Sequence, residues 1–121
     1  MFQINNKDFQ ILGKYKNFLD YLDKTLENVP RKDFYYKDLI RQKAYAILDA
    51  ILECSYEENM DHIGKYKQAI RSNLAVIDFL VDRLFDKHYI NEKQTSKIVL
   101  CLVEINKMTS GWINNMVKCG S

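Results

Sequence analysis

The sequence predicts an all-α protein, an antiparallel up-down-up-down four-helix bundle that occupies residues 1–121 as a single domain. Three observations lead to this prediction. Four segments repeat apolar residues at alternating steps of three and four, which is the spacing of one helix face. The chain contains only one Pro and four Gly, too few for the many tight turns of a β-sandwich or barrel. The connections are short, so that consecutive helices are expected to run antiparallel.

The first two helices are expected on either side of Pro30. The first stripe consists of Leu12, Tyr15, Leu19, Leu22, Leu26 and Val29. It ends at Val29 because Pro30 cannot continue a helix. The second stripe consists of Ile40, Ala44, Ile47, Ile51 and Cys54, flanked by Leu48 and Leu52. Asp33 is the expected N-cap of this second helix.

The last two helices are expected after a polar loop near Asn59 and a connection near Tyr89. Asp61 is the expected cap of the third helix. The third stripe consists of Tyr66, Ile70, Asn73, Ile77, Leu80 and Leu84, broadened by Leu74, Val81 and Phe85. Asn91 followed three residues later by Gln94 has the spacing of a capping box and predicts the start of the fourth helix. The fourth stripe consists of Thr95, Ile98, Leu102, Ile105, Thr109, Trp112 and Met116.

The amino-acid composition excludes several classes of protein. Hydrophobic residues make up 47% of the chain and charged residues 28%, which excludes a disordered chain. No apolar run approaches the ~18 residues of a spanning helix, and the N-terminus lacks the pattern of a signal peptide. We therefore expect a soluble, cytoplasmic protein without a membrane partner. The three cysteines are far apart and form no C-x-x-C pair, so neither a disulfide framework nor a zinc site is predicted.

The motifs of common enzymes are missing from the sequence. There is no glycine-rich phosphate loop, nucleophile elbow or H-E-x-x-H motif, and only two histidines are present. We therefore expect a protein without catalytic residues, metal or cofactor. One alternative is a ribonuclease, because Arg83 and His88 have the R-x4-H spacing of HEPN-type ribonucleases. The simpler interpretation places both residues among the cations that favour a helix C-terminus.

Charge is unevenly distributed although the net charge is only +2. Residues 31–43 hold five basic and two acidic residues, residues 62–77 hold three basic residues and no acid, and residues 44–61 hold five acids and no base. Any single run is typical of a solvated surface of mixed charge. The alternative interpretation is a basic surface that binds phosphates and a separate acidic rim. The expected nucleic-acid contacts are Arg31, Lys32, Lys37 and Arg41, with Lys65, Lys67 and Arg71 as a second cluster at the opposite end of the bundle.

Tyrosines alternate with these bases and are candidates for stacking on nucleic-acid bases. Tyr35 and Tyr36 are the expected exposed pair, whereas Tyr15 and Tyr66 lie on apolar stripes and are expected to place only their hydroxyls at the bundle edge. Further exposed aromatics predict a homo-oligomer. The expected oligomer or partner interface consists of Phe34, Tyr35, Tyr89, Gly111 and Trp112, and Phe79 is also expected to be exposed. In the alternative interpretation, Trp112 packs in the core and Gly111 lets another helix approach.

Three segments resemble a known family. Residues 104–113 read E-I-N-K-M-T-S-G-W-I and resemble its E-I-G-R-M-L-G-G-W-I ending. Val29-Pro30-Arg31 with Phe34 and Asp38-Leu39-Ile40-Arg41 resembles its F-P-[KR] hinge and second helix. Residues 85–94 resemble its third connection. This family contains the accessory variability determinant (Avd) of diversity-generating retroelements and the proteins encoded in bacterial 23S rRNA intervening sequences. Residues 46–54 lack the Pro and Gly of the intervening-sequence branch, which places the chain nearer Avd.

The resemblance implies a homopentamer of four-helix bundles. It also implies a basic surface that binds nucleic acid and a reverse transcriptase, supporting mutagenic cDNA synthesis. The alternative from another class is a protein–protein scaffold, whose oligomeric shape and acidic rim matter more than its bases.

Overall fold

The computed structural model describes the backbone of residues 6–120 and the side chains of residues 10–118. Four α-helices account for most of it: α1 (Asn6–Leu26), α2 (Phe34–Tyr56), α3 (Ile63–Asp86) and α4 (Glu92–Gly120). Short 3₁₀ helices, η1 (Arg31–Asp33) and η2 (Met60–His62), precede α2 and α3. Residues 6–120 contain no strand, so the all-α prediction is confirmed. No helix in this range is long and apolar enough to cross a membrane.

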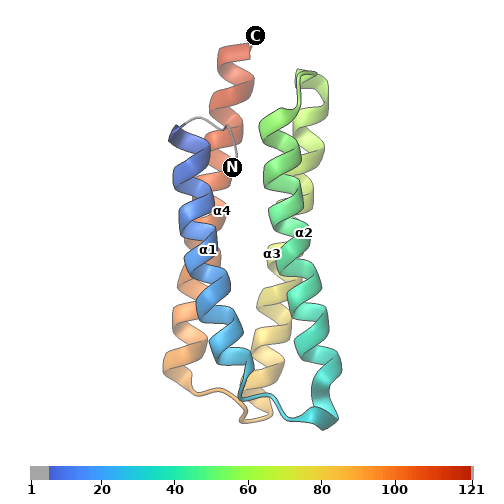
Figure 1. Ribbon diagram of the computed structural model, residues 1–121, viewed down its shortest axis with the longest axis vertical. Coiled ribbons are helices and arrows are strands. Elements are labelled where there is room, and N and C mark those ends of the chain that lie inside the picture. The colour runs from blue at the N-terminus through green and yellow to red at the C-terminus, as the bar shows by residue number, and fades with distance from the viewer. Residues whose placement is uncertain (1–5, 121) are drawn as a thin grey trace.

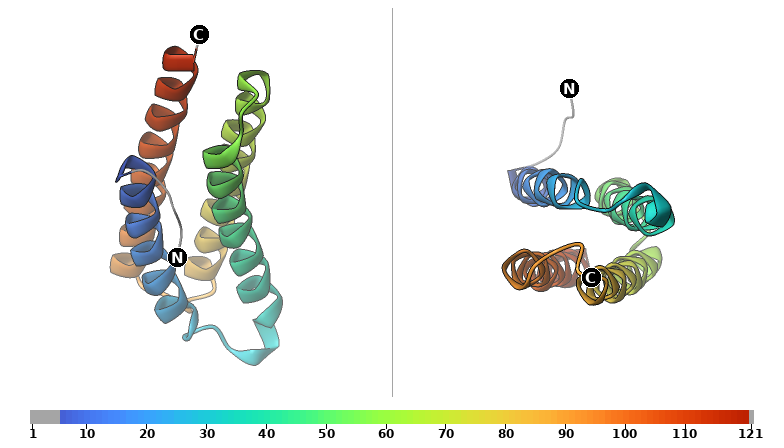
Figure 2. Two further views of the ribbon diagram at one scale, coloured as in Figure 1. Left: turned by 45° about the horizontal axis from the view of Figure 1, so that its top comes forward. Right: turned by 90° about the horizontal axis from the view of Figure 1, so that it is seen from below.

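The four helices lie side by side along the long axis of the molecule (Figure 1). Seen from below, α1 and α2 form one layer and α4 and α3 form a second layer beside it (Figure 2). The connections 27–33 and 87–91 lie at the end drawn at the bottom of Figure 1, called the lower end below, and the connection 57–62 lies at the upper end. α2 and α3 make the most extensive contact, followed by α3 and α4.

All four helices contribute to the core. The buried residues follow the predicted stripes closely on α2, α3 and α4, and less closely on α1. Every residue of the α2 stripe is buried, and the α3 stripe is buried except for Asn73. Thr95 and Met116, at the two ends of the α4 stripe, are partly buried. The α1 stripe was wrong at two positions: Ile11 and Phe18 are fully buried, and the neighbouring Leu12 and Leu19 only partly.

Tyr15 lies deeper than the sequence predicted. Its side chain is 1% exposed, and its hydroxyl donates to the backbone carbonyl of Ala44 at 2.5 Å, joining α1 to α2 inside the bundle. Burial, with a smaller Coulombic effect of Tyr45, raises the pKa of this phenol well above its ordinary value. The expectation that the hydroxyl emerges at the bundle edge is therefore wrong, because a backbone acceptor on α2 replaces water.

The capping-box prediction for α4 is confirmed in both directions. The Asn91 backbone N–H donates to the Gln94 side chain at 2.9 Å, and the Gln94 N–H donates to the Asn91 side chain at 2.8 Å. The two aspartate caps were wrong. Asp33 precedes α2 but makes no cap bond, because its carboxylate accepts from the Tyr89 hydroxyl and pairs with Lys87 at 3.5 Å.

At the other end of α2, Asp61 caps no helix, and Asn59 caps the short helix η2 instead. Its side-chain oxygen accepts from the Asp61 backbone N–H at 2.9 Å and so caps η2. α3 starts directly after η2, with no side-chain cap from His62.

α3 ends in a Schellman motif that places a histidine where glycine is usual. The Tyr89 N–H donates to the Leu84 carbonyl at 3.1 Å and the His88 N–H donates to the Phe85 carbonyl at 2.9 Å. His88 has φ 66°, in the left-handed region, where a side chain is strained.

We expect replacement of His88 by Gly to stabilise the protein by about 0.5–1 kcal/mol, because glycine removes the left-handed strain but loses more chain entropy on folding. Thermal unfolding should show an increase of about 2–5 °C in the melting temperature. Asp86→Gly is the matched control: Asp86 is the last residue of α3, so glycine there should lower the melting temperature. A lower melting temperature for His88→Gly would contradict this account of the α3 end.

Candidate nucleic-acid interface

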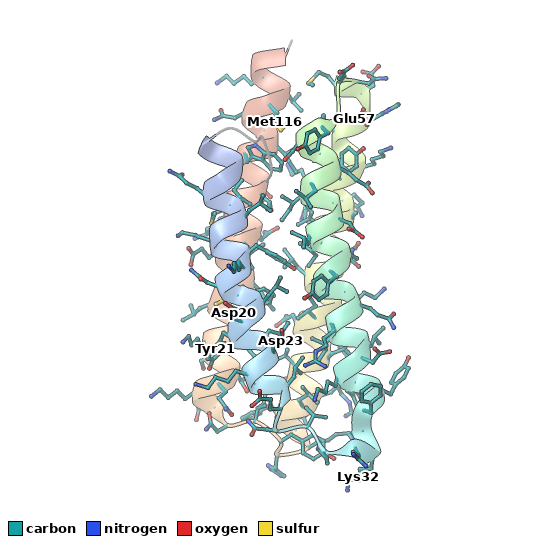
Figure 3. The ribbon with its side chains drawn as sticks, viewed as in Figure 1. Asp20, Tyr21, Asp23, Lys32, Glu57 and Met116 are labelled. Atoms are coloured by element: carbon teal, nitrogen blue, oxygen red, sulfur yellow. The ribbon has the colours of Figure 1, made fainter. Side chains whose placement is uncertain are left out.

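Arg31 and Lys32 project from η1 at the lower end, where Figure 3 labels Lys32. Pro30 has the extended conformation, with φ −72° and ψ 161°, and its carbonyl accepts from the Asp33 N–H at 3.0 Å. This turn holds two exposed cations that form no salt bridge among the described residues, although the charge of Lys32 acts on the neighbouring Asp33 carboxylate. Both charges are therefore available to a ligand.

Lys37 and Arg41 of α2, the other two residues of this predicted cluster, are less accessible to a ligand than Arg31 and Lys32. The Arg41 guanidinium pairs through Nε with the Asp23 carboxylate of α1 at 3.1 Å. Lys37 is partly buried. Arg41 therefore ties α2 to α1, and part of its charge is already compensated, which leaves η1 as the free part of this cluster.

The second predicted cluster does not form one patch. Lys65 lies over the Tyr66 ring, with Nζ 5.1 Å from the ring centroid. Lys67 donates to the Asn114 side chain of α4 at 3.0 Å. Arg71 lines a shallow groove between α3 and α4. The three bases therefore face different neighbours, although all lie in the half of α3 nearer the upper end (Figure 1).

Three lysines that the sequence analysis did not select surround a depression at the lower end. The depression lies between the end of α1 and the start of α4, and its lining includes Lys24, Lys93, Lys97, Tyr21 and one carboxylate, Glu27. Lys97 lies over the Tyr21 ring, with Nζ 4.0 Å from the centroid. Lys93 and Lys97 are one helical turn apart, but only the packing of α1 on α4 brings Lys24 beside them.

The connection at the upper end is acidic and carries Glu57, Glu58 and Asp61, although Lys65, Lys67 and Arg71 lie in the adjoining half of α3. The Glu57 carboxylate accepts from the Tyr66 hydroxyl at 2.9 Å and lies 3.1 Å from His62 Nδ1. The bond to Tyr66 is the main cause that lowers the pKa of Glu57, and the same bond raises the pKa of Tyr66 to about 12. The edge position predicted for the Tyr66 hydroxyl fits this contact.

The residues expected at an oligomer or partner interface occupy different environments. Phe34 and Tyr35 are exposed, Tyr35 to 70%, and so is Phe79. Tyr89 is partly buried because its hydroxyl bonds Asp33, so its expected exposure is wrong. Trp112 is buried at 9% exposure, whereas Gly111 is exposed and a Cβ added there would meet no atom within 4 Å. Among the described residues, no helix of the same protomer therefore approaches Gly111.

Tyr36 and the R-x4-H pair belong to one set of contacts at the lower end. Tyr36 is partly buried, not exposed as expected, and Lys87 lies 5.4 Å from its ring centroid. The interaction with the Tyr36 side chain is the main cause that raises the pKa of Arg83. His88 ends α3. Both members of the R-x4-H pair therefore have structural roles.

The fold and these surfaces define an all-helical protein with exposed cations at the lower end and a group of carboxylates in the connection at the upper end. Among the described residues, no group of three or more His, Cys, Asp or Glu side chains is arranged to hold a metal ion. No protein-family model matches the chain, and no curated protein matches its sequence.

Proposed function

We propose that this protein is a non-catalytic accessory protein that binds nucleic acid through the lower end of an antiparallel up-down-up-down four-helix bundle. One observation carries the proposal: five lysine and arginine side chains gather at this end from three separate segments. These are Lys24, Arg31, Lys32, Lys93 and Lys97. Cations that lack carboxylate partners bind phosphates mainly by counterion release, which depends little on base sequence.

An aromatic side chain stands beside these cations. Tyr35 lies in the first turn of α2, directly after η1, and its ring is 70% exposed. A base of single-stranded nucleic acid can stack on such a ring while Arg31 and Lys32 contact its phosphates. The combination favours single-stranded or looped RNA or DNA as the ligand, because a duplex keeps its bases stacked inside.

The family resemblance makes the proposal more specific. It supports an Avd-like role in the cytoplasm, in which the protein binds a reverse transcriptase of a diversity-generating retroelement and supports mutagenic cDNA synthesis. A reverse-transcriptase gene and a template repeat are then expected next to the gene for this protein. Copurification of the two proteins would test the partnership.

Charge reversal of Arg31 and Lys32 to Glu should weaken nucleic-acid binding at least tenfold at low salt. It should also reduce the slope of log affinity against log salt by about 1.5 for single-stranded ligands, because two phosphate contacts are lost. The measurement is fluorescence anisotropy with a structured RNA and a single-stranded DNA at several salt concentrations. Arg41 is left unchanged because its substitution would break the pair with Asp23.

The matched control reverses two exposed cations that lie away from the lower end, Lys16 of α1 and Lys107 of α4, and so changes the net charge equally. Lys14 is left unchanged because it pairs with Glu104. The control should leave most of the affinity and the salt slope intact. Equal losses in both variants would assign the binding to net charge alone and contradict a site at the lower end. A parent protein that shows no salt-dependent binding would overturn the proposed function.

The protein scaffold is the second candidate, and an exposed apolar surface on α3 and α4 favours it. Phe79 and Leu100 are 67% and 69% exposed, although large apolar side chains of this kind are usually covered. The scaffold function predicts that substitutions on this surface abolish association while those at the lower end do not.

A further inference from the structure

The exposed apolar side chains of α3 and α4 gather on one face. Phe79 of α3 and Leu100 and Val103 of α4 are 67%, 69% and 47% exposed. Between the two helices runs a groove in which Ala75 and Val99 line both halves. We call these five residues and the charged residues beside them the α3–α4 face.

Ala75 stands at the centre of the exposed side of α3. At 100° per residue, Arg71, Asp78, Phe79 and Asp82 all lie within about 60° of it around the helix. The buried residues of α3 lie on the opposite side. The charges change sign along this stripe: Arg71 precedes Ala75 by one turn, whereas Asp78 and Asp82 follow it.

We propose that the α3–α4 face binds a second copy of this chain about a two-fold axis that passes near Ala75. In this arrangement the two α3 helices cross antiparallel. Residues at equal distances on either side of Ala75 then face each other, so Arg71 of one copy meets Asp78 and the Phe79 ring of the other. The symmetry forms each contact twice, as an isologous interface requires.

Three further observations favour a second copy as the occupant. The charge pattern is complementary to itself when reversed, because the two-fold axis pairs Arg71 of each copy with Asp78 of the other, whereas a parallel arrangement about Ala75 places Arg71 beside Arg71. Ala75 is small, so the two helices can approach closely at the axis. The 24 residues of α3 give a length of about 36 Å, and two helices of ~10 Å width present roughly 700 Å² per copy, close to the ~800 Å² of a stable interface.

This inference does not rest on the proposed function. It reassigns Arg71, which the sequence predicted as a nucleic-acid contact, to the carboxylates of a second copy. It also differs from the pentameric ring that the resemblance implies, because a ring is closed by two different surfaces and a two-fold contact by one. The lower end, with Arg31 and Lys32, stays outside the interface and free for nucleic acid.

Charge exchange tests the pairing directly. Arg71→Asp and Asp78→Arg should each weaken self-association about tenfold or more, because like charges then meet twice across the axis. The combined variant Arg71→Asp/Asp78→Arg should restore it. Sedimentation equilibrium of the parent should give twice the 14.4 kDa mass of one chain. Glu53→Arg, an exposed reversal on α2, is the control and should leave the mass unchanged.

A cysteine at the axis gives a second, independent measurement. Helices packed 8–10 Å apart bring the two Ala75 Cα atoms to about 3.5–5.5 Å, a separation that overlaps the range of a disulfide. Ala75→Cys should therefore form a covalent dimer under mild oxidation, beyond any formed by the parent, and Glu53→Cys should not. A monomeric parent, a combined variant that stays dissociated, or equal crosslinking at positions 75 and 53 would overturn the proposal.

Discussion

Replacement of Tyr15 by Ala is expected to lower the free energy of unfolding by about 3–5 kcal/mol, the usual cost of truncating a buried aromatic side chain. Tyr15 is 1% exposed and belongs to the core cluster. Tyr15→Phe keeps the ring and removes only the hydroxyl that donates to Ala44, so about 1–2 kcal/mol is expected. Since proteins of this size are stable by about 5–15 kcal/mol, the alanine variant should be largely destabilised. Urea titration followed by circular dichroism measures both.

The same phenol makes stability depend on alkaline pH. Because the pKa of Tyr15 is raised in the folded state, its contribution is fully present below the ordinary tyrosine pKa of about 10 and is lost as pH rises toward the folded pKa. Above pH ~10 this group alone should lower the free energy of unfolding by about 1.4 kcal/mol per pH unit. The difference between the parent and Tyr15→Phe should therefore shrink between pH 10 and 11. A constant difference would mean that the hydroxyl reaches water.

The sequence was sufficient for the helices and most of the core, and the reason is visible in α2. Its stripe Ile40, Ala44, Ile47, Ile51 and Cys54 lies on one helix face and is buried throughout, whereas Leu48 and Leu52 beside it are only partly buried. In α1 apolar residues stand next to each other, as Ile11 with Leu12 and Phe18 with Leu19, so two overlapping stripes fit the period. Only the packing of α1 against α4 and α2 decides between them.

The candidate site was less predictable because it depends on contacts between distant segments. Asp33 and Tyr89 are 56 residues apart, and their bond removes the first from its capping role and the second from the surface. Lys24 joins Lys93 and Lys97 only because α1 ends beside the start of α4. Local signals such as the Asn91–Gln94 capping box are complete within four residues, which explains why that prediction was confirmed.

Replacement of Trp112 by Ala is expected to cost about 3–5 kcal/mol of unfolding free energy, because the indole is buried within the protomer at 9% exposure.

Gly111→Ala should have the opposite effect. Gly111 lies inside α4, and an added Cβ meets no atom within 4 Å, so the higher helix propensity of alanine should stabilise the protein by about 0.5–1 kcal/mol. Chemical unfolding measures both variants, and Trp112, the only tryptophan, reports unfolding of the parent by its fluorescence.

The variants at Gly111 and Trp112 distinguish between two roles for these adjacent residues, packing in the core of one protomer and contact between subunits. If residues 111 and 112 formed a seam, as the resemblance to the E-I-G-R-M-L-G-G-W-I ending leaves open, Gly111→Ala would place a methyl group between subunits and lower the oligomer mass. If they serve the protomer alone, the mass of Gly111→Ala equals that of the parent and its unfolding midpoint rises. Trp112→Ala should then unfold at lower denaturant at every protein concentration, because the lost contacts lie inside one chain. A Trp112→Ala variant with parental stability and a reduced mass would instead assign the indole to the seam.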